Sequence, residues 1–300
     1  MPMNAPFDRR LLALHRARAL KKRTEGADFL MRLVAQDIED RLAVTTRTFD
    51  LALDLGGHTG VVHDALSRSS RVGTVLRADL FAADTATGTP DLVVDDEILP
   101  LADASLDLAV SALSLHWVND LPGALIQIRR ALKPDGLFLG ALAGGDTLWE
   151  LRDALLSAEV ELTGGASPRV SPFADTREMG GLMQRAGFAL PVADQDRLTV
   201  RYDSAFHLMR DLRAMGATSI LAERGQAASR SLFMRMAEIY SERHADPDGR
   251  IRATFQILSV SGWAPHESQQ QPLKPGSARM SLAEALGTHE VSAGEKPAQD

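Results

Sequence analysis

The segment LDLGGHTG joins an acidic residue to a group of glycines, directly after an apolar run. Glycines let a chain turn tightly from a strand into a helix, and they let a cofactor approach backbone that a Cβ atom would obstruct. Asp54, Gly56 and Gly60 keep the outer frame of a D-x-G-x-G-x-G nucleotide-binding loop. His58 occupies the middle glycine position and Gly57 stands one residue early, so the loop by itself is a weak indicator of a nucleotide site.

Carboxylates follow two later apolar runs. Asp79 stands nineteen residues after Gly60, where an acid could accept hydrogen bonds from both hydroxyls of a ribose. Asp95, Asp96 and Glu97 follow the next run, where a carboxylate could accept from an adenine amino group. Each acid alone could be a solvated residue at a strand end, but together with the loop they predict a cofactor site.

The elements that must position these residues alternate between short β-like runs and helical ones, which is typical of a parallel sheet with helices on both faces. Ligands bind such sheets at the carboxyl ends of the strands, where the loop and the acids fall. A helix capped by Asn119 or Asp120, with Pro122 in its first turn, follows the fourth strand. The predicted strands are 48–55, 72–78, 91–94, 106–113 and, after a turn at 133–136, 137–143.

The C-terminal half predicts a further helix and two long strands. Asp175 and Glu178 form a capping-box start to a helix that closes at Gly187. Two helices, 204–215 and 229–241, separate the predicted strands 196–202 and 251–263. We interpret the region 203–245 as a lid or docking surface, with core of the same domain as the alternative. The predicted organisation is a basic helical segment at 1–45, a catalytic domain at 46–266 and a mobile polar tail at 267–300.

Composition restricts the chemistry further. The 300 residues contain no cysteine, which excludes disulfides, thiolate catalysis and cysteine-ligated metals. No apolar run approaches the roughly 20 residues that cross a bilayer, and the start lacks a signal-peptide core, so secretion is not expected. Residues 1–23 contain seven Lys and Arg and one Asp, which gives them a formal charge of +6. Because the whole chain has a net charge of −7, the remaining residues carry −13. The body is therefore a poor candidate for binding nucleic acid.

The basic start, residues 7–23, predicts an amphipathic helix. Its apolar stripe consists of Phe7, Leu11, Leu14, Ala17 and Leu20. Three interpretations stay open: a first helix with a solvated basic face, a docking helix for an acidic partner or a membrane surface, and an organelle-targeting peptide.

Five motifs in order resemble the class I S-adenosylmethionine-dependent methyltransferase superfamily: LDLGGHTG, ADL, DDEILPL, LDLAVSALSLHWVNDLPGAL and RRALKPDGLFLGALAGGDTLWELR. Within it, SLHWVNDLP, GGDTLWELR, SPFADTREMGGLMQRAGF and ATFQILSVSGWAPHESQ resemble the methyltransferase-like assembly factors of respiratory complex I over nearly the whole chain. A more distant resemblance, to the malonyl-acyl-carrier-protein O-methyltransferase of biotin synthesis, covers the loop and the fourth-strand region.

The resemblance implies an α/β, Rossmann-like class I methyltransferase fold: a seven-stranded, mostly parallel sheet with helices on both faces, an antiparallel last strand and a small helical insertion. It also implies S-adenosylmethionine as the cofactor. The residues it assigns to the cofactor are Asp54, Gly56, Gly57, His58 and Gly60 under the methionine part, Asp79 and Leu80 at the ribose, Asp95 and Asp96 at the adenine side, and Ser114.

His116, Trp117 and Asn119 stand, with Ser114, where substrate meets the cofactor's sulfonium in this superfamily. Methyl transfer needs alignment, and a base only when the nucleophile carries a proton at working pH. His116 is either that base or a structural histidine beside Trp117. The chain lacks the Asn-Pro-Pro-aromatic signature of enzymes that methylate amide or exocyclic amino nitrogens, so those substrates are disfavoured.

The complex I assembly factors are known for hydroxylating an arginine of a core subunit, so the resemblance implies arginine hydroxylation or methylation of a protein substrate, a complex I core subunit. Hydroxylation would require an oxygen-activating centre, and the pattern at His244, Asp246 and His266 is too weak to predict a metal site. The alternatives are an O-methyltransferase of a small or carrier-bound carboxylate, and a non-catalytic assembly chaperone. The expected compartment is a bacterial cytoplasm, with the mitochondrial matrix as the alternative.

Overall fold

The computed structural model describes residues 5–82, 88–223, 225, 227–270 and 282–289. The chain divides into two compact units, Met1–Pro265 and His266–Asp300. The second unit contains a short helix, α9 (Leu282–Ala285). Most of the tail predicted at 267–300 lies outside the described residues. None of the described helices is long and apolar enough to span a membrane.

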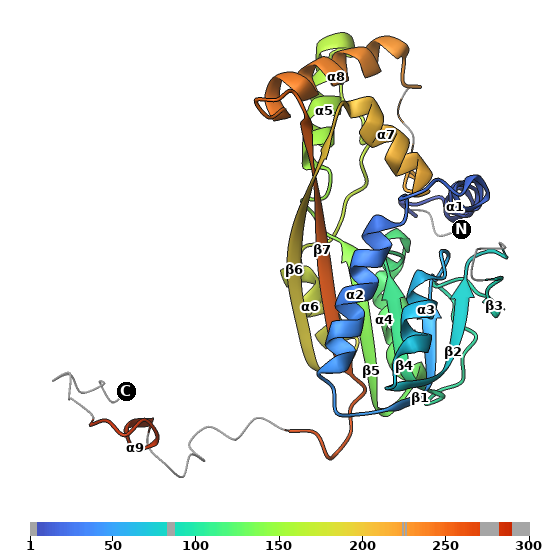
Figure 1. The fold of residues 1–300 in the computed structure, drawn as a ribbon, viewed down its shortest axis with the longest axis vertical. Helices are drawn as coiled ribbons and strands as arrows, with labels where there is room; N and C mark the ends of the chain where they lie inside the picture. Colours follow the sequence, from blue (N-terminus) through green and yellow to red (C-terminus); the bar gives the residue numbers. More distant parts are fainter. Residues whose placement is uncertain (1–4, 83–87, 224, 226, 271–281, 290–300) are drawn as a thin grey trace. The chain divides into compact units, whose positions relative to one another are not determined.

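A seven-stranded sheet forms the centre of the first unit as far as the structure describes it (Figure 1). The strand order is β3-β2-β1-β4-β5-β7-β6. Strand β7 pairs antiparallel with β5 and β6, and the other pairs are parallel, which confirms the predicted fold class. The strands are β1 (Phe49–Leu55), β2 (Val72–Asp79), β3 (Leu92–Val93), β4 (Leu106–Ala112), β5 (Leu132–Ala143), β6 (Ala189–Tyr202) and β7 (Ile251–Trp263).

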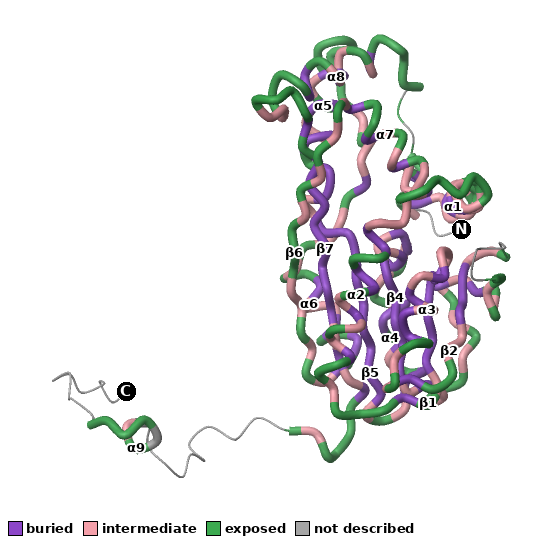
Figure 2. The backbone as a smooth tube through the Cα atoms, in the orientation of Figure 1, coloured by how far each residue is buried: buried purple, intermediate pink, exposed green. Residues whose placement is uncertain are grey.

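Helices cover both faces of this sheet. Helices α2 (Phe29–Ala43) and α3 (Val61–Arg68) pack on one face, and α4 (Leu121–Ala131) and α6 (Thr176–Arg185) pack on the other. The central strands are apolar on both sides because both sides are covered, and Figure 2 shows them as the most continuously buried part. The predicted capping box at Asp175 and Glu178 is present at the start of α6.

Three helices form a separate apolar cluster beyond the far ends of β6 and β7 (Figure 1). They are α5 (Trp149–Thr163), α7 (Ala205–Ala214) and α8 (Arg230–His244). We call this layer the helical cap. The predicted insertion at 203–245 supplies only α7 and α8, so the cap is larger than the sequence indicated because α5, which follows β5, packs against α8.

Helix α1 (Arg9–Lys22) lies at the carboxyl ends of the parallel strands and packs against α7 (Figure 1). Its predicted apolar stripe is confirmed only in part, because Phe7 is buried and Leu11 packs beside it. The buried residues of the helix are Leu12 and Arg16, whereas Leu14 is 52% exposed. The helix buries an arginine because carboxylates and backbone carbonyls at the strand ends face it, and pattern alone does not reveal such partners.

Two strand boundaries also differ from the sequence prediction. The turn expected at 133–136 lies inside β5, where the register against β4 shifts and Asp135 adopts a positive φ of 65°. Strand β6 starts at Ala189, seven residues before the predicted start, because it pairs with nearly all of β7. Long antiparallel pairing overrides the weak local pattern at 189–195.

Candidate active site

The glycine loop connects β1 to α3 and folds back onto the end of β2. Gly56 and Gly60 have φ angles of 78° and 75°, a region that favours glycine. The backbone N–H groups of Gly56 and Gly57 both donate to the carbonyl of Ala78, at 2.9 and 3.1 Å. The loop is therefore held at the carboxyl ends of two neighbouring strands, where the sequence places it.

Side chains crowd this loop so closely that two of its glycines cannot be replaced without a shift. A Cβ atom at Gly57 would lie 2.2 Å from Oδ2 of Asp54. A Cβ atom at Gly56 would lie 2.3 Å from the side chain of Ser114. Gly57, which departs from the usual spacing, is thus required by the carboxylate beneath it.

Two buried carboxylates border the loop. Asp54 is fully buried, and burial, together with the charge of Asp79, raises its pKa to about 7, while Arg77 opposes the rise. Asp79 is 3% exposed, and burial raises its pKa to about 6 although Arg16 lowers it. Both carboxylate oxygens of Asp54 and Oδ1 of Asp79 are buried without a hydrogen-bond partner among the described residues. Such oxygens fit a ligand that brings its own donors.

The acids after β3 lie at the same edge. Asp96 is buried, and its Oδ2 accepts a hydrogen bond from Ser114 Oγ at 3.0 Å. Asp95 is half-exposed, and both acids pair with Arg9 of α1. Leu80 packs at the border of a small apolar cluster that contains Phe7, Leu12, Trp117, Ile220 and Leu221. The structure thus brings the predicted cofactor residues together, and it adds two arginines of α1, Arg9 and Arg16, which the sequence pattern did not single out.

The residues after β4 form a short 3-10 helix, η1 (Leu115–Trp117). His116 is half-buried, and its Nδ1 accepts a hydrogen bond from the N–H of Ala143 at 3.4 Å. Burial and the nearby charge of Arg16 lower the pKa of His116 to about 3. A neutral imidazole with so low a pKa is a poor general base near pH 7, so the geometry favours a positioning role. Asn119 is turned away, because its Oδ1 accepts from the N–H of Phe7 at 2.8 Å.

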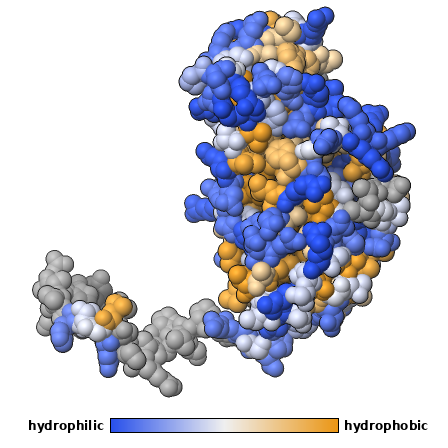
Figure 3. All heavy atoms as spheres, viewed as in Figure 1, coloured by the Kyte–Doolittle hydropathy of each residue, from blue (hydrophilic) through white to orange (hydrophobic). Residues whose placement is uncertain are grey.

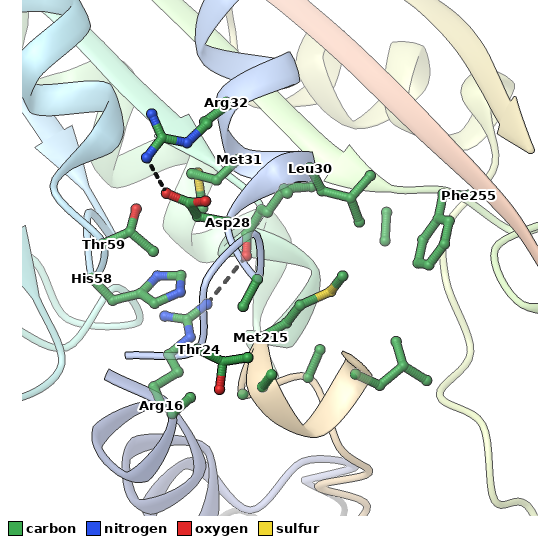
Figure 4. Close-up of a pocket in the computed structure, with 18 of the residues that line it drawn as sticks. Arg16, Thr24, Asp28, Leu30, Met31, Arg32, His58, Thr59, Met215 and Phe255 are labelled. Atoms are coloured by element: carbon green, nitrogen blue, oxygen red, sulfur yellow. Dashed lines mark hydrogen bonds and ion pairs between the residues drawn. The ribbon is translucent and has the colours of Figure 1, made fainter. Parts of the chain in front are cut away.

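A cavity of about 400 Å³ opens beside the glycine loop (Figure 4). His116 and Trp117 line it, as does Phe173, whose ring meets both of theirs edge-on. Figure 4 shows Arg16 and His58 near one another on one side, and Leu30, Met215 and Phe255 on the other. The apolar lining comes from α2, the end of α7 and β7. Figure 3 shows apolar side chains gathered below the helical cap, whose own surface mixes polar and apolar residues.

The mouth of the cavity is polar. It includes Thr24, Glu25 and Asp28 from the turn between α1 and α2, and Asp28 pairs with Arg32 at 2.6 Å. His58, the unusual loop residue, is half-buried with Nδ1 3.2 Å from the Gly56 carbonyl. Burial and the charge of Arg16 hold the pKa of His58 well below its usual value, so the ring is neutral.

The weak metal pattern does not assemble in the described part of the chain. Nε2 of His244 donates to Oδ2 of Asp153 at 2.9 Å, beside Arg243. Among the described residues, no group of three or more histidine, aspartate and glutamate side chains could hold a metal ion.

A comparison with known proteins matches the same part of the chain that forms the loop and the central strands. A methyltransferase domain model matches residues 53–140, which run from the glycine loop to β5. The mouse protein named mitochondrial arginine-hydroxylase NDUFAF5 is 41% identical over 275 residues, 90% of this chain and 80% of its own. The human protein of the same name is 42% identical over 263 residues, 86% of this chain and 76% of its own. The chain belongs to the NDUFAF5 family.

Other matches are shorter or structural. A malonyl-acyl-carrier-protein O-methyltransferase from Xylella fastidiosa is 40% identical over 172 residues, 57% of this chain and 56% of its own. The crystal structure of BH2331 from Bacillus halodurans superposes with a TM-score of 0.53 at 14% identity, over 77% of this chain and 98% of that one. This likeness shows the Rossmann-like fold.

The NDUFAF5-family chain is therefore an enzyme of the S-adenosylmethionine-dependent methyltransferase superfamily, with S-adenosylmethionine as its cofactor. The site fits this cofactor. Asp54 and Asp79 offer buried acceptors for the ligand's hydroxyl and ammonium donors. When bound, the cofactor supplies an activated methyl group.

Proposed function

We propose that this protein modifies an arginine side chain of a protein substrate, a core subunit of respiratory complex I, during assembly of that complex. The observation that carries the proposal is membership of the family in which proteins about 41% identical over nearly all of the chain are named arginine-hydroxylases. Those relatives are named as mitochondrial, so the proposal covers the mitochondrial matrix as well as the bacterial cytoplasm.

The cavity has the character that an arginine side chain requires. Arginine combines an apolar stem with a planar cationic head. Leu30, Met215 and Phe255 offer apolar surface for the stem, and Glu25 and Asp28 offer carboxylates near the mouth. Aromatic rings next to the glycine loop give the inner end a surface on which a guanidinium can stack.

Hydroxylation and methylation make different demands on this cavity. Methylation of a guanidinium nitrogen releases a proton, and His116 is a poor acceptor because its pKa is about 3. Hydroxylation of a carbon inserts one oxygen atom of dioxygen into a C–H bond, reduces the other oxygen atom to water with two electrons from a reductant and two protons, and asks for no base at the guanidinium. The low pKa of His116 therefore disfavours it as the base for methylation, and the name that the similar proteins carry is what favours hydroxylation as the reaction that we propose.

A basic surface beside the mouth supports a protein partner. Arg10, Arg18, Lys21 and Lys22 are exposed on α1, and none has an ion pair with a described residue. Arg23 continues this surface to the rim of the cavity. We propose that an acidic segment of the substrate protein docks here while its arginine enters the cavity, with contact to an anionic membrane surface as the competing outcome.

Mass spectrometry of complex I core subunits, with and without the gene, tests the reaction. A gene-dependent gain of about 16 mass units on an arginine supports hydroxylation, and about 14 supports methylation. If neither appears while complex I assembly still fails without the gene, the catalytic proposal is wrong and a non-catalytic chaperone takes its place.

A second candidate is O-methylation of a carrier-bound carboxylate. The Xylella relative supports it, and so does Arg16, whose positive charge at the cavity would attract a carboxylate. Incubation with S-adenosylmethionine and malonyl-acyl-carrier protein tests it. The candidate predicts a gain of about 14 mass units on the acyl group, and an unchanged acyl group at full cofactor occupancy excludes it.

A further inference from the structure

Two arginines of α1 lie at the edge of the sheet that carries Asp54, Asp79 and Asp96, which we call the cofactor edge. Arg9 and Arg16 are seven residues apart, about two helical turns, so they share one face. Arg9 pairs with Asp96, lies 3.2 Å from Oδ1 of Asp95, and donates to the carbonyl of Trp117 at 3.2 Å. This face of α1 therefore meets the acids that the fold uses for cofactor binding.

Arg16 is held in one place by the end of β4. Its Nη2 donates to the carbonyl of Leu113 at 3.1 Å, and its Nη1 donates to Ser114 Oγ at 3.3 Å. Leu113 adopts a left-handed conformation, with φ of 50°, which is unfavourable for a residue with a Cβ and is typical of functional sites. The guanidinium is 3% exposed, so its position depends on these two acceptors and on its charged neighbours.

The pair formed by Arg16 and Asp79 leaves one oxygen free. Arg16 Nη1 lies 3.7 Å from Asp79 Oδ1, which is close enough for strong attraction but too long for a hydrogen bond. Oδ1 is buried and has no hydrogen-bond partner among the described residues. The charge of Asp79 is thus partly compensated by Arg16 while the acceptor capacity of Oδ1 stays unused.

We propose that Arg16 is a positioning residue of the cofactor site: it keeps Asp79 ionised beside the glycine loop, with Oδ1 free to accept a hydrogen bond from a ribose hydroxyl. Helix α1 is then part of the cofactor site. The contacts that hold α1 in place support this. A Cβ atom at Gly216 would lie 3.0 Å from the Cα of Arg16, and Nδ1 of His15 lies 2.6 Å from Oγ1 of Thr218. The segment after α7 fixes the backbone that carries Arg16.

Charged groups from four elements face Asp79. Arg16 of α1 and Arg77 of β2 favour the carboxylate, whereas Asp54 of β1 and Asp96 after β3 oppose it, and burial opposes it most. With Arg16 in place the pKa of Asp79 is about 6. Removal of the Arg16 charge takes away the strongest attraction, so the carboxyl should then protonate close to neutral pH.

Calorimetric titration of the full chain with S-adenosylhomocysteine between pH 5 and pH 8.5 tests the inference without turnover. The unmodified protein should lose affinity progressively as the pH falls through about 7 and then about 6, the pKa values of Asp54 and Asp79, because a protonated carboxyl is a weaker acceptor. In Arg16→Met the loss should begin at least about one pH unit higher, with affinity largely recovered at pH 8.5. Ionisations of the ligand itself cancel in the ratio between the two proteins.

Three further variants separate positioning from structural damage. Arg16→Lys should keep the profile within about half a pH unit of the unmodified protein, because it retains the charge. Arg177→Met, which removes an exposed arginine of α6, should leave the profile unchanged. In an Asp79→Asn background, Arg16→Met should have no further pH effect. A uniform loss of affinity at every pH in Arg16→Met, or an unshifted profile, would overturn the inference, and neither outcome bears on the nature of the substrate.

Discussion

The cofactor edge and the substrate cavity are neighbours, yet they are built on opposite principles. At the cofactor edge, Asp54, Asp79 and Asp96 are nearly inaccessible, and arginines lie within a few ångströms of Asp79 and Asp96. The far side of the cavity is apolar, and its walls come from segments that lie far apart in the chain. The first region depends on charge compensation and the second on shape, so mutations should separate binding of cofactor from selection of substrate.

The largest expected effect is at the ribose acid. Asp79→Asn removes the ionised acceptor and should weaken S-adenosylhomocysteine binding by roughly 100-fold or more, because hydrogen bonds to charged groups contribute most. Calorimetry at pH 8 measures it. Asp196→Asn, at an exposed position of β6, is the matched control and should bind normally. Near-normal binding by Asp79→Asn would remove Asp79 from the cofactor site.

A bulky side chain in the cavity should lower modification of the substrate and leave cofactor binding nearly unchanged. Ala217 lines the cavity, and Ala217→Phe should lower arginine modification by at least about tenfold while it changes cofactor affinity by less than about twofold. The readouts are modified-peptide yield and calorimetry on the same preparation. Ala43→Phe, at the exposed end of α2, controls for added bulk. Equal losses of both functions would show that the two regions are not separable.

Asp54 should reveal a conflict between stability and binding. Its pKa is raised to about 7 in the folded protein, so the unfolded chain releases this proton at lower pH and ionisation costs stability as pH rises from about 4 to about 7. Asp54→Asn should therefore stabilise the cofactor-free protein by about 2–4 kcal/mol at pH 8, and by less than half of that at pH 5. Urea unfolding measures the gain.

The exposed neighbour of Asp54 offers the control for this measurement. Asp50→Asn, on the same strand, should change the free energy of unfolding by less than about 0.5 kcal/mol at either pH. Asp54→Asn should also weaken cofactor binding. A gain in stability that did not depend on pH would contradict the assignment of the cost to the ionised carboxylate.

The smallest effect is expected at His58. Its neutral ring sits beside the loop and contacts the carbonyl of Gly56, so His58→Gly removes a side chain without removing a charge. We expect the dissociation constant for S-adenosylhomocysteine to change by less than about threefold. A change above tenfold in either direction would make His58 a determinant of cofactor affinity, and would show that a side chain of the loop itself sets this affinity.

Local patterns predicted the positions of the glycine loop, of Asp79 and of the capping box for a physical reason. The loop, Asp79 and the capping box at Asp175 depend on residues a few positions apart, and the strands that carry them are long and apolar. Arg16 could not be predicted in the same way, because its partners Leu113 and Asp79 lie far along the chain. One signal was present: Arg9, Leu12 and Arg16 share a face of α1, whereas the predicted stripe selected Leu14.

The cavity was even less accessible to sequence reasoning. The turn at 24–28, Phe173 and the end of α7 meet only in the folded protein, and each is an ordinary loop or helix end when taken alone. His116 and Trp117 were predicted near the substrate side and they line the cavity, but the low pKa of His116 depends on burial and on Arg16. Charge environment is a property of the assembled site, and the residue type does not carry it.

The short pairing between Phe7 and Leu221 has a consequence for the order of folding. The N–H of Asp8 donates to the carbonyl of Ile220 at 2.7 Å, so the start of α1 is fastened to chain that is synthesised more than two hundred residues later. During translation the strands β1 to β5 can form while α1 still waits for its seat. We therefore expect α1 to be one of the last helices to dock, although it is synthesised before the strands. A nascent chain would then be unable to retain its cofactor until residues 216–222 have emerged.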